Sequence, residues 1–345
     1  MSSSNPDANS LRPALRASFL KAVDEAGLGD HSELLLAHAR ECVHFFYNKS
    51  KEELPPGATK VGGEPDLPDS VEWPDGEDEE GRPAGKAEFL AQFNLAEVPD
   101  GHGLPFPKTG HLWVFVRAPQ MTRTTAAIIY RDASETLRPR SKPKSDYVPE
   151  YGWRELRTAA LSFAPGVSLP FSSRAFQRSL KDFQELDDEL MELQEKLTPD
   201  MDSYGPRDGI DGQIGGFSYQ AEFDLPREYA ITGLGHPEFV GDDQWVSVDD
   251  LQASIDRGLP GMKGPNLKSY REELRESIPG VRWIQKNNKK IQAAADALQL
   301  LFMFRPNGRI GLDLGSGMYL DFLMHRDALE RLDFSNVYCA LPMLL

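Results

Sequence analysis

Hydrophobic positions at the start of the chain recur at helical spacing. Four apolar residues from Leu11 to Ala22 lie three or four apart, which predicts a helix that ends near Gly29. A second helix is expected after the N-cap Ser32, with one apolar face formed by Leu35, Leu36, Ala39, Cys42, Val43 and Phe46. Residues 1–54 are therefore expected to be an N-terminal helical segment that precedes a domain over residues 55–345.

Shorter apolar runs predict the strands of that domain. Residues 88–95 and 111–117 are expected to be buried strands that are joined by a connection with Gly and Pro. Later strands are expected over residues 298–305, 318–324 and 337–341. Their Val, Ile, Phe and Tyr content is typical of strands.

Several helices are expected between and beside these strands. From Ser173 to Leu197, apolar residues spaced by three or four predict one helix with a heptad-like stripe. The stripe fits an interface between copies of the chain, but a buried core helix is the simpler interpretation. Further helices are expected over residues 249–258, 268–277 and 326–332.

Paired glycines begin two similar series of elements. Gly62 and Gly63 precede the strands at residues 88–95 and 111–117, and Gly215 and Gly216 precede, after a helical insertion, the strands from residue 298 onwards. Such pairs indicate tight turns with positive φ more readily than a ligand site. The order predicts an α+β fold of internally duplicated antiparallel sheets with flanking helices.

Five short motifs in this order resemble the YwqG-like family of bacterial proteins. They are Lys60 to Pro68 (KVGGEPDLP), Trp73-Pro74, Phe89 to Leu95 (FLAQFNL), Ile214 to Gln220 (IGGFSYQ) and Asp333 to Leu341 (DFSNVYCAL). The resemblance covers roughly residues 55–345 and implies a duplicated α+β fold with antiparallel sheets, without a settled activity. Members of that family often have a Trp-Gly-Asp-like turn before the last long strand, whereas this chain has Leu314 to Gly317 there. No role that depends on the aspartate of that turn is therefore carried over to this chain.

The charge of the chain favours a basic protein partner. Its 54 acidic and 38 basic residues give a net charge of −16, which disfavours nucleic acid and anionic lipid surfaces. A local basic run from Arg138 to Lys144 is interpreted as a solvated linker. Two acidic surfaces are expected to contact the partner, with the candidate residues Glu77, Asp78, Glu79 and Glu80 in a loop and Asp187, Asp188 and Glu192 on a helix.

Cysteine and histidine usage argues against thiol or zinc chemistry. Cys42 and Cys339 are the two cysteines, which fits a reducing compartment, and a cytoplasmic location is expected. No apolar run approaches the roughly 20 residues that cross a bilayer. His38 and Cys42 would share a helix face, but Cys42 lies on the apolar stripe and is interpreted as a core residue. None of the seven histidines has zinc-site spacing.

One acidic loop has the spacing of a calcium site. Asp200, Asp202, Gly205, Asp208 and Asp211 occupy the first, third, sixth, ninth and twelfth places of a loop after a helix. Tyr204 at the fifth place and the poor exiting helix favour an ordinary polar turn, so no cofactor is expected and calcium is the alternative.

The sequence lacks a Walker loop and a strand-linked G-x-G-x-x-G fingerprint, so nucleotide binding has no support. The expected function is that of a non-catalytic protein-binding module, for example an immunity-like protein that neutralises a toxin. The alternative function is that of a metal-dependent hydrolase or calcium-binding protein that uses the loop from Asp200 to Asp211.

Overall fold

The computed structural model describes residues 11–48, 53–78, 82–117, 125–144, 156–180, 183–198, 210–219, 224–234, 247–258, 263–312 and 319–340. The chain divides into two compact units. The first unit comprises Met1–Phe223 and Gln299–Leu345, and the second comprises Asp224–Leu298. Residues on both sides of Pro55 therefore belong to the first unit.

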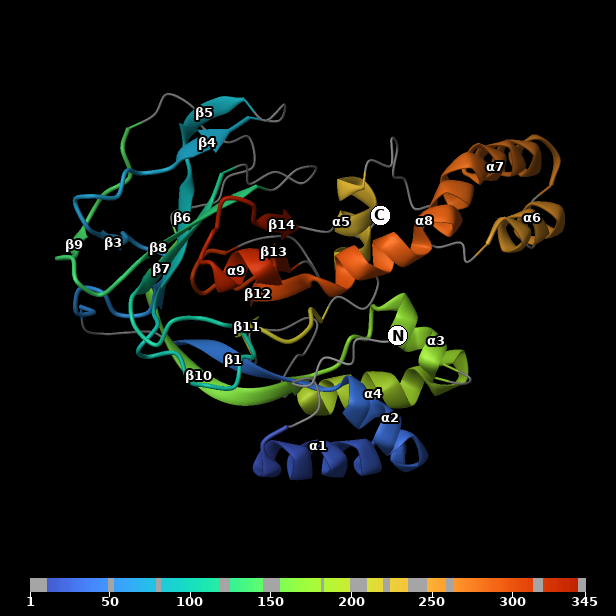
Figure 1. Cartoon of the computed structure of the whole chain (residues 1–345), viewed down its shortest axis with the longest axis horizontal. Coiled ribbons are helices and arrows are strands. Elements are labelled where there is room, and N and C mark those ends of the chain that lie inside the picture. Colours follow the sequence, from blue (N-terminus) through green and yellow to red (C-terminus); the bar gives the residue numbers. More distant parts are fainter. Residues whose placement is uncertain are drawn as a thin grey trace. The chain divides into compact units, whose positions relative to one another are not determined.

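A large, nearly closed antiparallel sheet forms the first unit (Figure 1). Within the described ranges its strands are β1 (Arg40–Asn48), β2 (Lys60–Val61), β6 (Glu88–Asn94), β7 (His111–Val116), β8 (Ala126–Arg131), β10 (Ala159–Ser168), β11 (Gly212–Ile214), β12 (Leu298–Phe304), β13 (Leu320–His325) and β14 (Tyr338–Ala340). Their order is β14-β13-β12-β11-β1-β10-β2-β6-β7-β8. A bridge between Thr125, beside β8, and Tyr338 brings the two edges together.

The mixed helix and sheet class predicted from the sequence is confirmed. All five strands that the apolar runs predicted are present, as β6, β7, β12, β13 and β14. Strands β8 and β10 were not predicted.

Strand β7 shows why some strands are continuous apolar runs. Leu112 and Val114 belong to the core on one face of the sheet, whereas Trp113 and Phe115 belong to a second core on the other face. All six residues of β7 are buried because both faces are covered.

Aromatic side chains fill the main core of the sheet. The rings of Phe93 on β6 and Phe302 on β12 stack with their centroids 4.6 Å apart. The ring centroids of Phe45 on β1 and Phe304 on β12 are 5.3 Å apart, and those of Phe304 and Phe322 on β13 are 5.7 Å apart. Burial of these large rings contributes to the hydrophobic stabilisation of this face.

The helix predicted through Phe46 is wrong beyond His38. Helix α2 (Ser32–His38) ends where Ala39 becomes extended, and β1 follows at once. Adjacent apolar residues at 42, 43, 45 and 46 fit a helix face and a two-sided strand equally well. The long ladder of β1 with β10, from Arg40↔Ser168 to Asn48↔Ala160, decides in favour of the strand.

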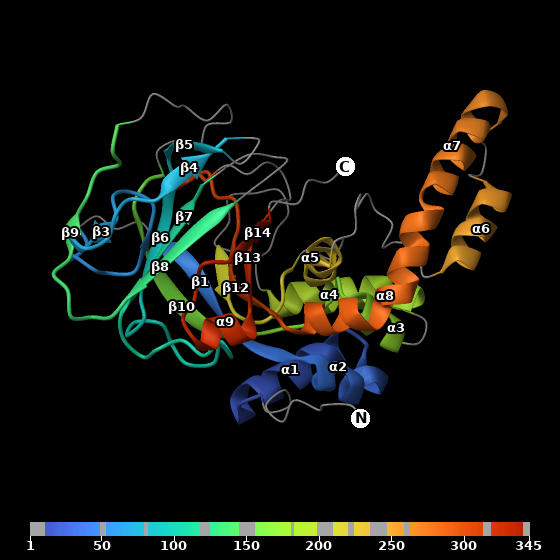
Figure 2. The ribbon, with the colours of Figure 1, turned by 45° about the horizontal axis from the view of Figure 1, so that its top comes forward.

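A layer of helices packs against one end of the sheet (Figures 1 and 2). It contains α1 (Pro13–Glu25), α2, α3 (Arg174–Ser179) and α4 (Asp187–Leu197), and its core includes Phe19, Leu28, Leu35, Phe176 and Leu193 with Val167 and Leu169 from the β10 side. Within the described ranges this unit also contains the helix α9 (Arg326–Glu330). None of the helices in the described ranges is suited to crossing a bilayer.

The single helix predicted from Ser173 to Leu197 is also wrong. Helix α3 stops at Ser179, Leu180 is extended with φ −86° and ψ 112°, and a 3-10 turn (Phe183–Leu186) precedes α4. The interpretation of its apolar stripe as core holds for Phe176, Leu180 and Leu193, which are buried. Tertiary packing of this stripe does not require continuous helical backbone.

Two small sheets lie beside the large one in the first unit. Strand β3 (Asp66–Leu67) pairs with β9 (Arg138–Pro139), and β4 (Asp75–Glu77) pairs with β5 (Pro83–Lys86). Leu67 and Trp73 from these segments are buried on the face of the large sheet that carries Trp113 and Phe115.

The second unit is helical. It contains α5 (Leu225–Gly233), α6 (Val248–Arg257), α7 (Gly264–Glu276) and α8 (Ile278–Asp296). Figure 2 shows α6 beside α7, where Leu251, Ile255 and Leu274 pack together. The predicted helices over residues 249–258 and 268–277 are confirmed as α6 and α7, whereas α8 was not predicted.

The paired glycines adopt the left-handed backbone that their turns require. Gly62 and Gly63 follow β2 with φ 64° and 69°, and Gly215 and Gly216 follow β11 with φ 71° and 72°. Gly62 N donates a hydrogen bond to Leu90 O (2.8 Å), and Gly215 N donates to Leu301 O (3.2 Å). At both turns the bond reaches the neighbouring long strand.

We expect Gly215→Ala to destabilise the protein far more than Gly103→Ala. Both glycines have positive φ, but a Cβ at Gly215 would lie 1.9 Å from His102 O, whereas one at Gly103 would meet nothing within 4 Å. The strain of a positive φ alone should lower the free energy of unfolding by about 1–2 kcal/mol in Gly103→Ala. In Gly215→Ala the added backbone clash should raise this loss of stability to about 3–4 kcal/mol. Urea unfolding measures both values, and equal losses would contradict this account of the turn.

Candidate functional site

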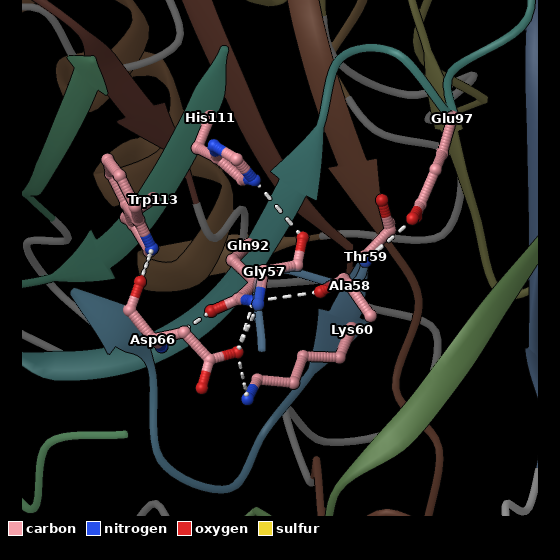
Figure 3. Close-up of polar contacts among 9 residues, drawn as sticks. All are labelled: Gly57, Ala58, Thr59, Lys60, Asp66, Gln92, Glu97, His111 and Trp113. Carbon is pink, nitrogen blue, oxygen red and sulfur yellow. Dashed lines mark hydrogen bonds and ion pairs between the residues drawn. The ribbon is translucent and has the colours of Figure 1, made fainter. Parts of the chain in front are cut away.

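A buried polar cluster of the first unit surrounds Asp66 (Figure 3). Its Oδ2 atom accepts hydrogen bonds from Lys60 Nζ (2.8 Å), Gln92 Nε2 (2.8 Å) and Gly57 N (3.0 Å). Lys60 lies on β2, Asp66 on β3 and Gln92 on β6, and all three are buried. The ammonium group and the two N–H donors together compensate for the removal of the carboxylate from water.

Backbone groups complete this cluster. Asp66 N donates to Gln92 Oε1, and Gln92 Nε2 also donates to Ala58 O, each at 2.8 Å. Trp113 Nε1 donates to Asp66 O at 3.0 Å. The side chain of Gln92 therefore joins the segment before β2 and the segment at β3 to the central strand β6.

His111 and Glu97 fix the loop that enters β2. His111 Nε2 donates to Gly57 O at 3.2 Å, and its ring stacks on Trp113 with centroids 5.7 Å apart. Burial lowers the pKa of His111, so the ring is neutral at physiological pH. Glu97 Oε2 accepts from Thr59 N at 2.9 Å (Figure 3). These contacts hold the loop against the sheet.

A second buried polar cluster lies on β1. His44 Nε2 is 2.6 Å from Tyr219 Oη and 3.3 Å from Cys42 Sγ. Burial lowers the pKa of His44 to about 4 and raises the pKa of the Cys42 thiol far above neutrality. A neutral imidazole beside a protonated thiol lacks the thiolate that nucleophilic catalysis requires. This outcome agrees with the interpretation of Cys42 as a core residue, although it lies on a strand.

The chain beside the second glycine pair is held by side-chain hydrogen bonds. Gln213 Nε2 donates to Gly215 O (2.6 Å) and Phe217 O (3.0 Å), and Phe217 N donates to Ser168 Oγ (3.0 Å). Ser218 Oγ donates to Asp321 Oδ2 at 2.6 Å. Asp321 is fully buried on β13, and burial raises its pKa to about 7.

The structure places two of the four candidate residues in the predicted acidic loop, Glu77 and Asp78, in internal ion pairs. Glu77 pairs with Arg117 at 3.2 Å and accepts a hydrogen bond from Thr125 Oγ1 at 3.0 Å. Asp78 pairs with Arg82 at 2.7 Å. Glu79 and Glu80 lie outside the described residues. The charge that Glu77 and Asp78 offer to a partner is therefore partly neutralised within the chain.

The acidic helix face is more open. Asp187, Asp188, Glu192 and Glu195 are exposed on α4. Glu192 pairs with Lys196 at 3.3 Å, whereas the structure gives no basic partner to the other three within the described part of the chain. Met191 lies on the same face and is 52% exposed. Met191 lies off the apolar stripe, so helical periodicity does not single it out, and its position between acidic residues is the signal in the sequence.

The predicted calcium loop falls largely outside the described residues. Asp200, Asp202 and Asp208 lie there, and Asp211 is described. The carboxylate of Asp211 accepts hydrogen bonds from Tyr47 N and from Asn307 Nδ2, so both its oxygens have partners within the chain. Among the described residues no three His, Cys, Asp or Glu side chains form a group suited to a metal ion. Calcium binding stays a prediction.

The basic run that the sequence suggested as a solvated linker makes specific contacts. Arg138 pairs with Asp69 at 2.8 Å, Lys142 pairs with Glu88, and Arg140 Nη1 donates to Val71 O at 2.6 Å. These contacts tie the segment around β9 to the rest of the first unit.

Sequence reasoning treated the glycine motif as a turn and missed the cluster around Lys60 and Asp66. Two signals could have found it. A lysine and an aspartate lie on either side of the glycine pair, and Gln92 is a polar residue within an otherwise apolar strand. A polar residue in such a strand indicates a buried hydrogen-bonding role.

We expect Lys60→Met to cost about 3–5 kcal/mol of stability, because it leaves the buried Asp66 carboxylate without a cation. Lys142→Met is the matched control, since its ion pair with Glu88 is partly exposed and should contribute less than about 1 kcal/mol. Lys60→Gln should lie between the two, because an amide can still donate to Asp66. Chemical unfolding measures all three variants, and a neutral Lys60→Met would refute the role of the pair.

The raised pKa of Asp321 predicts a pH dependence of stability. The native protein holds this proton more tightly than the unfolded chain, so the free energy of unfolding should fall as pH rises from about 4 to about 7. Asp321→Asn should remove this fall, which amounts to about 1.4 kcal/mol for each unit by which the pKa is raised. Asp327→Asn, an exposed control on α9, should keep the wild-type profile in thermal unfolding at each pH. Parallel profiles for wild type and Asp321→Asn would contradict the assignment.

Comparison with known proteins gives a family and no activity. A family model described as Domain of unknown function (DUF1963) matches residues 59–342. No curated protein matches the chain. The matched region contains Lys60, Asp66, Gln92 and both glycine pairs, whereas β1, α1 and α2 precede it.

Proposed function

The chain belongs to the DUF1963 family of unknown function, and from this premise we propose that it is a non-catalytic protein-binding module. The proposed contact surface is the acidic face of α4, and the proposed partner is a basic protein. The observation that carries the proposal is the exposed Met191 among carboxylates on this helix.

Helix geometry places Met191 in the middle of the acidic face. It follows Asp188 by three residues and precedes Glu195 by four, so the three side chains lie on one side of α4. The opposite side carries Leu190 and Leu193, which are buried in the helical layer. Packing against the core thus orients the acidic face towards solvent.

The two residue types have different roles in the proposed contact. Carboxylates attract a basic surface and speed its association, and the net charge of −16 adds to this attraction at long range. A flexible, polarisable methionine supplies apolar contact to partners of varied shape. The loop from Glu77 to Glu80 is a secondary contact in this proposal, because Glu77 and Asp78 already have basic partners.

The hydrolase alternative has less support from the described residues. His44, Cys42 and Asp66 are buried in hydrogen-bonded clusters, and the shifted pKa values of His44 and Cys42 keep both groups uncharged at neutral pH. A reaction centre needs groups that substrate can reach and that can change protonation state near the working pH.

The order of strands supports the internal duplication as part of the same proposal. Reading outward from the central pair, β10-β2-β6-β7-β8 on one side corresponds to β1-β11-β12-β13-β14 on the other. Val61 of β2 pairs with Ala91 of β6 just before the first glycine pair. Ile214 of β11 pairs with Phe302 of β12 in the same way just before the second. In this alignment Lys60 corresponds to Gln213, and a charged cluster in one half replaces a neutral one in the other.

The proposal also retains the narrower expectations from the sequence. The YwqG-like resemblance indicates a bacterial protein, and two buried free cysteines fit a cytoplasmic one. An immunity-like protein that neutralises a basic toxin is one concrete form of the module. The acidic face of α4 would then cover the basic surface of the toxin.

We expect a Lys-rich helical peptide to bind the full chain with an affinity that depends on α4. Met191→Ala, and Asp188→Asn with Glu195→Gln, should each weaken binding about 3- to 10-fold, as the loss of exposed contacts worth about 1 kcal/mol implies. Leu234→Ala, which alters another exposed apolar residue, and Asp327→Asn are the matched controls and should change nothing. Isothermal titration calorimetry provides the affinities.

Equal affinities for the α4 variants and the wild type would remove α4 from the contact. Loss of binding in the control variants to the same extent would show that the peptide responds only to net charge.

A further inference from the structure

The outward face of α8 carries the opposite charge to that of α4. Arg282, Lys286, Lys289 and Lys290 are exposed, and from Ile278 to Ala295 this helix contains no acidic residue. Val281, Ile284 and Ile291 are buried on the opposite side. The cations therefore form one stripe that faces away from the packed side of the helix.

The stripe is not neutralised by the described part of the chain. No ion pair or side-chain hydrogen bond of these four residues occurs within it. Several lysines and arginines elsewhere in the described part of the chain do have acidic partners, for example Lys268 with Glu272 and Lys60 with Asp66. A concentrated positive stripe in a chain of net charge −16 is thus available to an external anionic surface.

The charged positions of the two helices have the same spacing. Asp188, Glu192 and Glu195 on α4 follow the pattern i, i+4, i+7, and Arg282, Lys286 and Lys289 on α8 follow the same pattern. Each series extends over about 10 Å at 1.5 Å per residue. Two helices laid side by side in parallel can therefore place three opposite charges against each other.

The geometry points to self-association in which α8 of one copy binds the acidic face of α4 on a second copy. This inference rests on the proposed function, because it takes the α4 face as a contact surface and names its basic partner. A polyanion such as nucleic acid fits less well, since the rest of the chain repels phosphates and the stripe covers only about 10 Å. An anionic membrane also fits less well, because the apolar face of α8 is already packed.

The expected association is weak and sensitive to salt. Exposed ion pairs contribute about 0.2–1 kcal/mol each, and Met191 against the methylene groups of Gln285 adds apolar contact at the matching position. Because α4 and α8 are different surfaces, the copies can pair reciprocally in a two-fold dimer or form a chain. Both arrangements raise the mass above that of one copy.

Charge reversal of each face tests the pairing by sedimentation equilibrium of the full chain in about 50 mM and about 500 mM NaCl. The α4 reversal is Asp188→Lys with Glu192→Lys and Glu195→Lys, and the α8 reversal is Arg282→Glu with Lys286→Glu and Lys289→Glu. Wild type should associate at low salt and dissociate at high salt. Each reversed chain alone should be monomeric, whereas an equimolar mixture of the two, and a chain that carries both reversals, should associate.

A matched control keeps the test specific. Lys263→Glu alters a basic residue of the same unit that lies outside α8, and it should associate like wild type. Circular dichroism confirms that each variant is folded. Wild type that stays monomeric at low salt, or a mixture that does not associate, would overturn the inference. Binding of the Lys-rich peptide that still depends on Met191 would then show that the proposed function stands without self-association.

Discussion

The antiparallel ladder between β1 and β10 is the constraint on which the other elements depend. It aligns Arg40–Asn48 with Ala160–Ser168, and the outer edges of the two strands then pair with β11 and β2. The ladder places Phe45 in the main core, where it contacts Phe93 and Phe304 from strands on both sides. It also continues into Val167 and Leu169, against which the helical layer packs. The orientation of α4 therefore depends on a strand that precedes the matched family region.

The buried polar clusters serve this framework. Asp66 joins β3 to β2 and β6, and the hydrogen bonds of Gln213 and Asp321 fix the chain that follows β11. In a low-dielectric interior such groups are costly unless their partners are present, which makes them effective at specifying one arrangement. The side chains of Asp66, Gln213 and Asp321 are buried and hydrogen-bonded within the chain. In the proposed function, recognition is assigned to the surface, where α4 and α8 carry opposite charges.

Much of the fold follows from local pattern, and the failures have physical causes. The runs at β7 and β12 are apolar on both faces because both faces are covered, so their burial could be predicted. The stretch from Cys42 to Phe46 was misassigned because its apolar positions fit two periods and only the ladder with β10 separates them. Leu180 is buried in the core as expected, although α3 ends just before it. Burial depends on the direction of the side chain and does not require helical backbone.

The candidate site was predicted less well than the fold. Glu77 and Asp78 are acidic in sequence, but only the structure shows that they form ion pairs with Arg117 and Arg82. Asp187, Asp188 and Glu192 were identified correctly as exposed, because an amphipathic helix separates its faces by position alone. Met191 and the stripe on α8 were missed, as their meaning depends on which side of each helix is packed.

Hydrogen–deuterium exchange of the full chain with the Lys-rich peptide tests most directly whether the peptide binds at α4 and leaves the buried polar clusters of the sheet unchanged. The account predicts slower exchange at the amides of Asp187–Leu197 on α4 and unchanged exchange at β2, β3 and β11. Slower exchange around Lys60 and Asp66 or around Gln213, with α4 unchanged, would contradict it and place ligand binding at the buried clusters.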